Sequence, residues 1–535
     1  MTVFRRLSLI LLFIATVILI SASITSCDNS LENGIQYSGS TVVGADKNAE
    51  SLTVKDGTTS IASGAFADCK NLSSVTLPDS ITEIAAGAFS GCDALIKREG
   101  GVAYVENWVI GADIDATDIT IKAGTRGIAR EAFIGITTLK SVSIPDSVEN
   151  IGARAFFRCS SLEKITLPFI GKGASSKNSM HFGYIFGAFN KEQNSEYVPE
   201  SLIEVNITSA KWIADYAFSG CSKIKTVSLP STLTEIGAHA FSDCTALSEI
   251  IIPDSVGCIK EKAFYKCSAL TTVKLPENES FTEILEYTFA YCSSIKEITI
   301  PHSVDKIGAC AIARCTSLES LTIENNTLER IGQQAFDGCT YLTSVDLSVK
   351  SLGKGAFQNC ISLTDVTLGM GTVEIESYAF NGCSGITDFS MPESVRSIGE
   401  HAFYACHSLT YISIGEGITS IEKSTFQNCI NLSGVTIPCS VSHIGENAFA
   451  GCTKLVTKED GVSYVDDWIT DIQPSVTSIE ITDAISGFAD GAFSGAVNLS
   501  EITFTGSADI WESVSKTIPK STLSSINVII NANKS

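Results

Sequence analysis

The sequence predicts an α+β repeat solenoid of about 17 units, each about 23 residues long, with short strands and short helical turns. Three observations support this prediction. An Ala-Phe pair followed by a Cys recurs at nearly constant spacing, apolar residues alternate ahead of it, and one unit alone buries too little surface to fold. The units must therefore stack, so that each covers the open core of its neighbour.

Each part of the unit has a physical interpretation, as in residues 142–159, VSIPDSVENIGARAFFRC. The alternating apolar residues before Pro145 predict a strand, and the Pro ends it where the chain turns a corner. The segment before Gly152 predicts a second extended piece, and Gly suits a corner that a Cβ would strain. The Ala-Phe-x-x-Cys segment predicts a short helical turn that directs Phe156 into the core.

The repeated Phe and Cys should form two ladders, because stacking places equivalent residues on one another. The Phe positions, with Ile312 in one further unit, are Phe66, Phe89, Phe133, Phe156, Phe189, Phe218, Phe241, Phe264, Phe289, Phe336, Phe357, Phe380, Phe403, Phe426, Phe449 and Phe493. The ladder Cys are Cys69, Cys92, Cys159, Cys221, Cys244, Cys267, Cys292, Cys315, Cys339, Cys360, Cys383, Cys406, Cys429 and Cys452. We expect these thiols to be mostly reduced and buried, although an exported chain could bridge some rungs.

These repeats resemble a known family. The segments SIGEHAFYAC (397–406) and LSGVTIP (432–438) are similar to repeats of the BspA-like leucine-rich repeat proteins of bacterial and protist surfaces, over about residues 50–505. The resemblance implies a leucine-rich-repeat-like right-handed coil with a horseshoe or curved form. It also implies surface display, with adhesion or protein binding as the usual role, and no catalytic activity.

Residues 1–26 are predicted to be a lipoprotein signal peptide. Arg5 and Arg6 precede an apolar run of about 14 residues, which is shorter than the roughly 20 needed to span a bilayer. The following Ile-Thr-Ser-Cys resembles a bacterial lipobox, in which Cys27 would be acylated. The alternative is an ordinary secretory signal cleaved near Ala22 or Ser26. Residues 27–49 are polar and mixed, and we expect a tether there.

Two extended repeats, 96–133 and 456–493, carry the same motif, G-V-x-Y-V-x-x-W. The motif predicts a hairpin added to the coil, with Glu106-Asn107 and Asp466-Asp467 as turn residues. Its two Trp, Trp108 and Trp468, either anchor a ligand or pack the hairpin onto the coil.

A third extended repeat, 169–212, is rich in Gly, Ser and Asn, and it is the candidate epitope because loops on rigid scaffolds often carry function. Its aromatic cluster either binds a partner or packs against the solenoid. The cluster consists of His181, Phe182, Tyr184 and Phe186. Beyond the last repeat, residues 506–535 are predicted to form a C-terminal cap over the exposed core edge.

Composition and motifs exclude several function classes. The chain has 59 Asp+Glu against 37 Lys+Arg and a net charge of −22, which argues against nucleic acid as a partner. We find no catalytic signature, so we expect no enzyme and no cofactor. No C-x-x-C spacing indicates a metal, and Cys406, which adjoins His407 and lies near His401, belongs to the Cys ladder.

The strand residues predicted to point outward form a small, polar and hydroxyl-rich face. They are Thr76, Ser143, Thr166, Asn206, Ser228, Ile251, Lys274, Thr299, Thr322, Asp346, Thr367, Ser390, Ser413, Thr436 and Thr503. Tyr411 is the aromatic candidate beside them. Such a face either hydrogen-bonds an extended partner or only reflects the strand preference of β-branched Thr.

The first hypothesis is therefore an exported lipoprotein of the outer membrane or cell surface, attached to the membrane through its N-terminal lipid. Its solenoid would mediate adhesion by binding a host or microbial protein or glycoprotein. The alternative is an envelope scaffold, facing the periplasm, with no external ligand.

Overall fold

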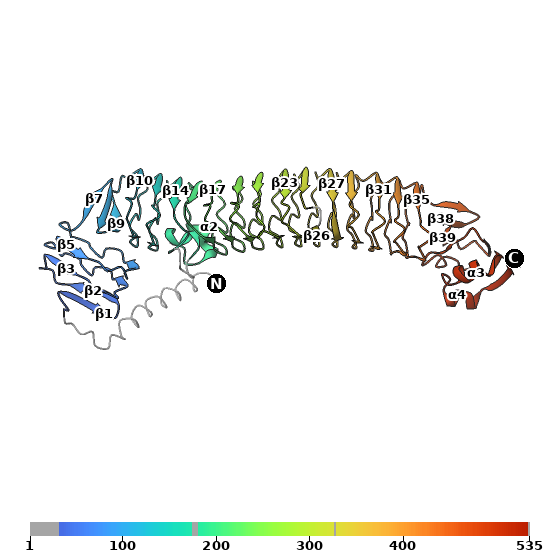
Figure 1. Ribbon diagram of the computed structural model, residues 1–535, viewed down its shortest axis with the longest axis horizontal. Coiled ribbons are helices and arrows are strands. Elements are labelled where there is room, and N and C mark those ends of the chain that lie inside the picture. Colours follow the sequence, from blue (N-terminus) through green and yellow to red (C-terminus); the bar gives the residue numbers. More distant parts are fainter. Residues whose placement is uncertain (1–30, 174–179, 326–327, 533–535) are drawn as a thin grey trace, which may run out of the picture. The chain divides into compact units, whose positions relative to one another are not determined.

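The computed structural model describes residues 31–173, 180–325 and 328–532, which form two compact units (Figure 1). Unit 1 comprises the described residues up to Ser161 together with Ile185–Gly187, and unit 2 comprises Leu162–Tyr184 and the chain from Ala188 onward. Cys27, the signal peptide and the start of the predicted tether lie outside the described residues.

Unit 1 consists of strands joined by turns. They are β1 (Ile35–Ser38), β2 (Thr41–Ala45), β3 (Ser51–Thr53), β4 (Ser60–Ile61), β5 (Ser74–Thr76), β6 (Glu83–Ile84), β7 (Lys97–Glu99), β8 (Val102–Val105), β9 (Trp108–Ala112), β10 (Asp118–Thr120), β11 (Gly127–Ile128), β12 (Ser141–Ser143) and β13 (Asn150–Ile151).

Part of the predicted tether, residues 27–49, is folded. Residues 35–45 form a hairpin. Strands β1 and β2 pair antiparallel, and β2 continues in parallel onto β4. Ile35 and Val42 are fully buried in a cluster with Phe66. The polar composition conceals these two apolar positions, which cover the open end of the first rung.

Unit 2 contains two rows of strands that stack rung upon rung (Figure 1). The long row is β14 (Lys164–Leu167), β15 (Glu204–Ile207), β17 (Thr226–Ser228), β19 (Glu249–Ile251), β21 (Thr272–Lys274), β23 (Glu297–Ile300), β25 (Ser320–Ile323), β27 (Ser344–Leu347), β29 (Asp365–Leu368), β31 (Asp388–Ser390), β33 (Tyr411–Ser413) and β35 (Gly434–Thr436). The short row is β16 (Trp212–Ile213), β18 (Glu235–Ile236), β20 (Cys258–Ile259), β22 (Glu283–Ile284), β24 (Lys306–Ile307), β26 (Leu328–Ile331), β28 (Val349–Leu352), β30 (Glu374–Ile375), β32 (Ser397–Ile398), β34 (Ser420–Ile421) and β36 (His443–Ile444).

Most neighbouring rungs pair in parallel and in register, so equivalent residues lie on one another. In the short row, Ile213 pairs with Ile236, and Ile236 pairs with Ile259. In the long row, Val205 pairs with Val227. The apolar side chains of both rows point into the space between them, and this space is the core of the solenoid.

The predicted helical turns are wrong. The Ala-Phe-x-x-Cys segments form successive tight turns that contain no helix. In one such segment, the Phe218 and Gly220 amides donate to Ala240 and Ser242 of the next rung, at 2.7 and 2.8 Å. The intervening Ser219 amide donates back to the carbonyl of Tyr216, whose φ is +59°. Alternate amides are thus used between rungs, and a left-handed residue interrupts each turn, so no α-helical bonding pattern can continue.

The Phe ladder follows the prediction over most of unit 2. Phe218, Phe241, Phe264 and Phe289 stack with ring centroids 5.1, 5.2 and 5.3 Å apart and rings within 6° of parallel. Ile312 is fully buried at the next rung, and the rings resume at Phe336. The solenoid core is therefore a continuous apolar column made of one large side chain per rung.

Phe189 does not belong to this ladder, because its side chain is 83% exposed. In unit 2 the core position is filled by Phe182, whose ring centroid lies 4.9 Å from that of Phe218. The insertion is held in place by Asn194, which accepts a bond from the Gly183 amide (2.8 Å) and donates to the Ala217 carbonyl (3.1 Å). The extra residues therefore shift the buried ring to an earlier position than the repeat pattern predicts.

The last part of unit 2 departs from the regular rungs. Its strands are β37 (Thr457–Glu459), β38 (Val462–Val465), β39 (Trp468–Ile472), β40 (Ser478–Thr482), β41 (Gly487–Phe488), β42 (Glu501–Gly506) and β43 (Asn527–Ala532). The described helices of the chain are η1 (Phe182–Phe186), η2 (Lys191–Gln193), α2 (Asn194–Tyr197), α3 (Ala508–Ser515) and α4 (Lys520–Ser525).

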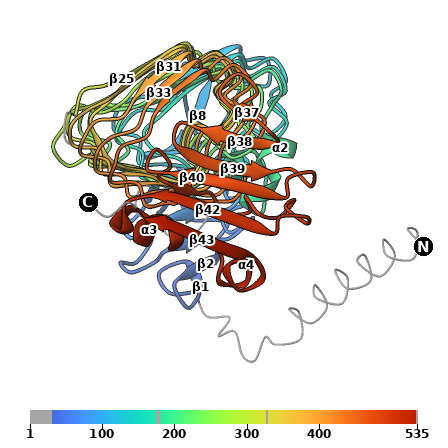
Figure 2. The same cartoon turned by 90° about the vertical axis from the view of Figure 1, so that its right-hand side faces the viewer.

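Strands β40, β42 and β43 lie side by side in parallel, and α3 lies beside them (Figure 2). Val514 of α3 and the following Ile518 are buried against Phe504 of β42. These residues cover the apolar core of the last repeat.

The two predicted hairpins are confirmed. Strands β8 and β9 pair antiparallel across a turn at Glu106-Asn107, and β38 and β39 pair across Asp466-Asp467. Both hairpins contain a register shift at the same place in the motif, between Ala103 and Tyr104 and between Ser463 and Tyr464. The shared motif therefore encodes the same bent hairpin twice.

Candidate functional site

The outward residues of the long row in unit 2 form a continuous surface, which we call the polar strand face. Its members are Thr166, Asn206, Ser228, Ile251, Lys274, Thr299, Thr322, Asp346, Thr367, Ser390, Ser413 and Thr436, and none of them is buried. Parallel pairing places them in register, as with Thr299 beside Thr322. The face is therefore a fixed, regularly spaced array of hydroxyl, amide and charged groups.

Charged and aromatic groups adjoin the polar strand face. Lys164 forms an ion pair with Glu204 on the next rung at 2.7 Å. Tyr411 is 44% exposed, and its hydroxyl lies 3.0 Å from the Thr436 hydroxyl. The Tyr411 ring lies against Gly434, where a Cβ would approach it to 3.0 Å. Tyr411 is thus held at the surface, where it can contact a partner.

The Cys ladder stabilises the rungs and offers little reactivity. The Cys159 thiol donates to the Phe133 carbonyl at 3.1 Å, and the same bond recurs between Cys244 and Phe218 at 3.2 Å. All 17 described Cys are free thiols. Burial raises the pKa of the Cys159 thiol to about 12. A buried thiol with so high a pKa is a poor nucleophile and a poor metal ligand.

The aromatic cluster of the third extended repeat is mostly inside the molecule. Phe182 and Phe186 are buried, and Tyr184 is half-buried with its ring edge-on to His181. His181 is 8% exposed, its Nε2 lies 3.2 Å from the Ala188 carbonyl, and burial lowers its pKa. Three of the four candidate residues therefore have little surface to offer a partner.

Trp108 and Trp468 are 1% and 2% exposed, so both indoles are packed inside their hairpins. Each lies against a Gly of the following rung. A Cβ at Gly127 would lie 2.4 Å from the Trp108 ring, and one at Gly487 would lie 2.7 Å from the Trp468 ring. These Gly residues leave room for the indole, which fastens the hairpin to the coil.

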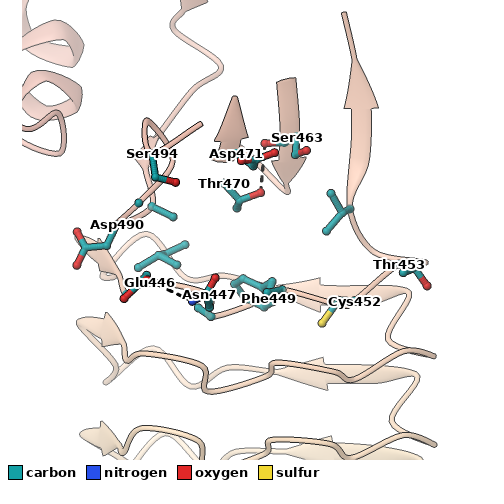
Figure 3. A pocket seen from close by; sticks show the side chains of 18 of the residues that line it. Glu446, Asn447, Phe449, Cys452, Thr453, Ser463, Thr470, Asp471, Asp490 and Ser494 are labelled. Atoms are coloured by element: carbon teal, nitrogen blue, oxygen red, sulfur yellow. Dashed lines mark hydrogen bonds between the residues drawn. The ribbon is translucent and has the colours of Figure 1, made fainter. Parts of the chain in front are cut away.

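The C-terminal hairpin encloses a cavity of about 490 Å³, which we call the C-terminal cavity (Figure 3). Ser463, Thr470 and Asp471 of the hairpin face Phe449 and the rung below across it. The rest of its lining includes Glu446, Asn447, Ala448, Cys452, Thr453, Val456, Lys458, Asp490 and Ser494. The hairpin wall is therefore rich in hydroxyl and carboxylate groups, whereas the rung below contributes apolar Ala448 and Phe449 as well as polar Glu446 and Asn447.

The N-terminal hairpin encloses a cavity at the same place in its own fold, which we call the N-terminal cavity. It measures about 180 Å³. Ala103, Ile110 and Gly111 line it at the motif positions that Ser463, Thr470 and Asp471 occupy in the C-terminal copy. The two hairpins thus share a backbone arrangement but differ in size and polarity of the space beneath it.

Sequence reasoning identified the hairpins but not the cavities. The repeated motif shows that a hairpin is present, yet the space beneath it depends on how far the hairpin is lifted from the rung. A comparison of the two motif copies could have found the difference, because within the two hairpin strands polar residues replace Ala103, Ile110 and Gly111, which line the N-terminal cavity. Among the described residues, no group of three or more His, Cys, Asp or Glu is placed to hold a metal ion.

The predicted lipidation site, Cys27, lies outside the described residues. No helix in the part of the chain that the structure describes is long and apolar enough to cross a membrane.

A family model described as the BspA type leucine-rich repeat region matches residues 43–99, 112–181, 211–343, 278–371 and 329–456, together more than half of the chain. No curated protein matches the chain.

Several of the similar solved structures are bacterial leucine-rich repeat proteins. One from Bacteroides ovatus is 25% identical, with 76% of this chain and 96% of that chain covered and a TM-score of 0.45. A leucine-rich cell surface protein from Faecalibacterium prausnitzii is 23% identical, with 79% and 98% covered and a TM-score of 0.30. A leucine-rich repeat protein from T. pallidum is 22% identical, with 39% and 82% covered and a TM-score of 0.24.

Proposed function

Because the chain belongs to the BspA-type leucine-rich repeat family, we propose that it is a lipid-anchored protein of the bacterial cell surface that mediates adhesion. Repeat proteins of this kind generally act in protein–protein interaction, are associated with surfaces, and are typically scaffolds rather than enzymes. The partner would be a host or microbial protein or glycoprotein. Acylation of Cys27 would attach the chain to the membrane.

 The net charge of −22 repels anionic lipid headgroups, so the acyl chains, and not the protein surface, would hold the protein at the membrane.

The polar strand face carries this proposal. Its groups project from strands that pair in parallel with a neighbouring rung, so little conformational entropy is lost when a partner binds. Hydroxyl and charged groups repeat at the spacing of stacked strands, about 4.8 Å, over many rungs. Tyr411 adds an exposed aromatic ring, the residue type that most often anchors an interface. An extended protein partner could therefore make many modest contacts at once.

The first experiment tests exposure at the cell surface. Protease is added to intact cells, with a periplasmic protein as the control for lysis. Cleavage of the solenoid while the control stays intact supports adhesion. Full protection contradicts it and favours a scaffold that faces the periplasm and has no external ligand.

The second experiment tests the anchor and the binding face. Cys27→Ala should move the protein from the detergent phase to the soluble fraction, and unchanged partitioning would contradict lipidation. Thr299→Arg with Thr322→Arg should reduce attachment of intact cells to immobilised matrix glycoproteins at least several-fold, because two bulky cations interrupt the face. Ser397→Arg is the matched control, since Ser397 is exposed on the short row. An equal effect of the control would contradict the assignment to the polar strand face.

A further inference from the structure

The two hairpins provide an internal comparison that separates what the fold needs from what a ligand would need. Both build a bent hairpin, a buried Trp and a cavity lined by the rung below. The N-terminal copy does this with Ala103, Ile110 and Gly111. The polar residues at the same positions of the C-terminal copy are therefore not required to form the hairpin.

One of these polar groups, the Ser463 hydroxyl, opens onto the cavity and is not bonded within the described part of the chain. Ser463 is 3% exposed as a residue, and no hydrogen bond of its hydroxyl occurs among the described residues, since the hydroxyl oxygen opens onto the C-terminal cavity. The neighbouring Thr470 hydroxyl donates to the Ser463 carbonyl at 3.2 Å, which leaves its own oxygen free to accept (Figure 3). Polar groups that line a cavity take their hydrogen bonds from water or from a ligand. A ligand that can both donate and accept hydrogen bonds would satisfy this wall.

The charges around the C-terminal cavity favour a neutral ligand. Glu446 is paired with Lys423 at 2.8 Å, whereas Asp490 lies 3.5 Å from the ring nitrogen of His443, which forms an ion pair with it only when the ring is protonated. Within the described residues this leaves Asp471 and Lys458 as lining groups without an oppositely charged neighbour. Asp471 and Lys458 place a strong acceptor and a strong donor at the cavity, and these two charges offset each other.

The loss of an ion pair releases Lys458. In the N-terminal copy, Arg98 lines the cavity and is paired with Asp113. Gln473 stands at the position equivalent to Asp113, so the C-terminal copy has no carboxylate there. The Lys458 ammonium is consequently available at the cavity.

Apolar lining residues indicate that the ligand also has an apolar face. Ala448, Phe449 and Val456 present apolar atoms opposite the hydroxyl and carboxylate wall. A volume of about 490 Å³ lies within the range of small-ligand sites, roughly 300–1,000 Å³. The ligand therefore needs one apolar face, several hydroxyl groups at its edge and no net charge. A pyranose ring has this combination.

We propose that the C-terminal cavity binds a neutral pyranose unit of a glycan. Asp471 accepts hydrogen bonds from ring hydroxyls, Ser463 and Thr470 bond further hydroxyls, Lys458 donates to a ring or hydroxyl oxygen, and the apolar lining residues cover the apolar face of the sugar. The inference does not rest on the proposed function, because no residue of the polar strand face lines the cavity. The experiments on sugar binding and on attachment to matrix proteins therefore test the two proposals independently.

The test uses saturation-transfer difference NMR on the full chain with the methyl pyranosides of glucose, galactose, mannose and N-acetylglucosamine, each alone. At least one should bind with a dissociation constant of about 1 mM, the strength expected for a ligand of this size. Absence of transfer to all four sugars would overturn the proposal. A competition experiment gives a second way to overturn it. If n-butylammonium displaces the bound sugar more effectively than added free sugar does, the cavity is a cation site.

Three variants assign the binding to the cavity. Ser463→Ala with Thr470→Ile and Asp471→Gly copies the N-terminal lining, and it should abolish transfer. Asp471→Asn keeps the size of the side chain and should weaken binding about tenfold, so it provides the answer if the triple variant does not fold. Thr457→Lys copies the N-terminal Lys97 at an exposed position outside the lining and should leave binding unchanged. Unchanged binding in Asp471→Asn, or equal loss in Thr457→Lys, would overturn the assignment.

Discussion

The two hairpin units, residues 96–133 and 456–493, have the same backbone plan and different cavities. Each is fastened by a buried Trp that lies against a Gly of the next rung. The N-terminal cavity is small and lined by Ala103, Ile110 and Gly111, whereas the C-terminal cavity is larger and polar. The comparison teaches that the shared motif residues specify the hairpin. The residues between them can vary, and they set the size and polarity of the cavity beneath it.

The comparison of the two hairpin units assumes that each repeat unit stacks as a whole and can be removed as a whole. Deletion of Gly382–Tyr404, one full unit, should leave the far-UV circular dichroism spectrum nearly unchanged, because the remaining rungs restack in register. Deletion of only residues 382–392 should abolish cooperative unfolding, because strands would then lie on turns. Equal destabilisation by the two deletions would contradict the stacking of exchangeable units.

The next largest effect is expected from the buried indoles. Trp108→Ala and Trp468→Ala should each destabilise their hairpin by about 3–5 kcal/mol, since both remove a fully buried side chain. Hydrogen exchange of the amides of β9 and β39 measures the local opening free energy in each variant. If the opening free energy falls by less than about 1 kcal/mol in only one hairpin, the two indoles do not stabilise their hairpins equally.

The Gly residues under the indoles should show a smaller effect with a definite order. Gly127→Ala and Gly487→Ala should each cost about 1–3 kcal/mol through overpacking. Gly127→Ala should cost more, because its Cβ would lie 2.4 Å from the indole rather than 2.7 Å. Gly371→Ala is the matched control, since a Cβ there meets nothing within 4 Å. The reverse order in thermal unfolding would show that the two indoles are not held alike.

The smallest effect concerns the turn of the C-terminal hairpin. Burial, together with the neighbouring Asp467, raises the pKa of Asp466 above its usual value. The folded state therefore binds a proton more readily than the unfolded state, so the hairpin should lose stability as pH rises through this raised pKa. Asp466→Asn should remove this dependence and slow exchange of the Val465 amide at neutral pH. Its φ of +52° also suits Asn. A pH dependence retained in Asp466→Asn would assign it to another group.

Much of the fold follows from the repeat pattern because stacked rungs use each residue in the same way. The Phe and Cys ladders, the outward polar positions and the two hairpins all lie where the spacing places them. Where an insertion breaks the spacing, prediction fails. Phe189 fits the pattern but is exposed, because Asn194 fixes an arrangement that buries Phe182 instead.

The helical turns were mispredicted for a different reason. The Ala-Phe-x-x-Cys segment has good local helix formers, but its alternate amides bond to the next rung. Local propensity cannot anticipate bonds between residues that only stacking brings together.

The sequence by itself determined the repeat, the side chains that fill the core, and the acidic surface, because periodic apolar residues must face one another once units stack. The tertiary structure alone decided which amides bond across rungs, which ring of the insertion is buried, and how much space each hairpin encloses. These properties depend on distances between segments far apart in the chain, and such distances are fixed only when every rung has packed on the next.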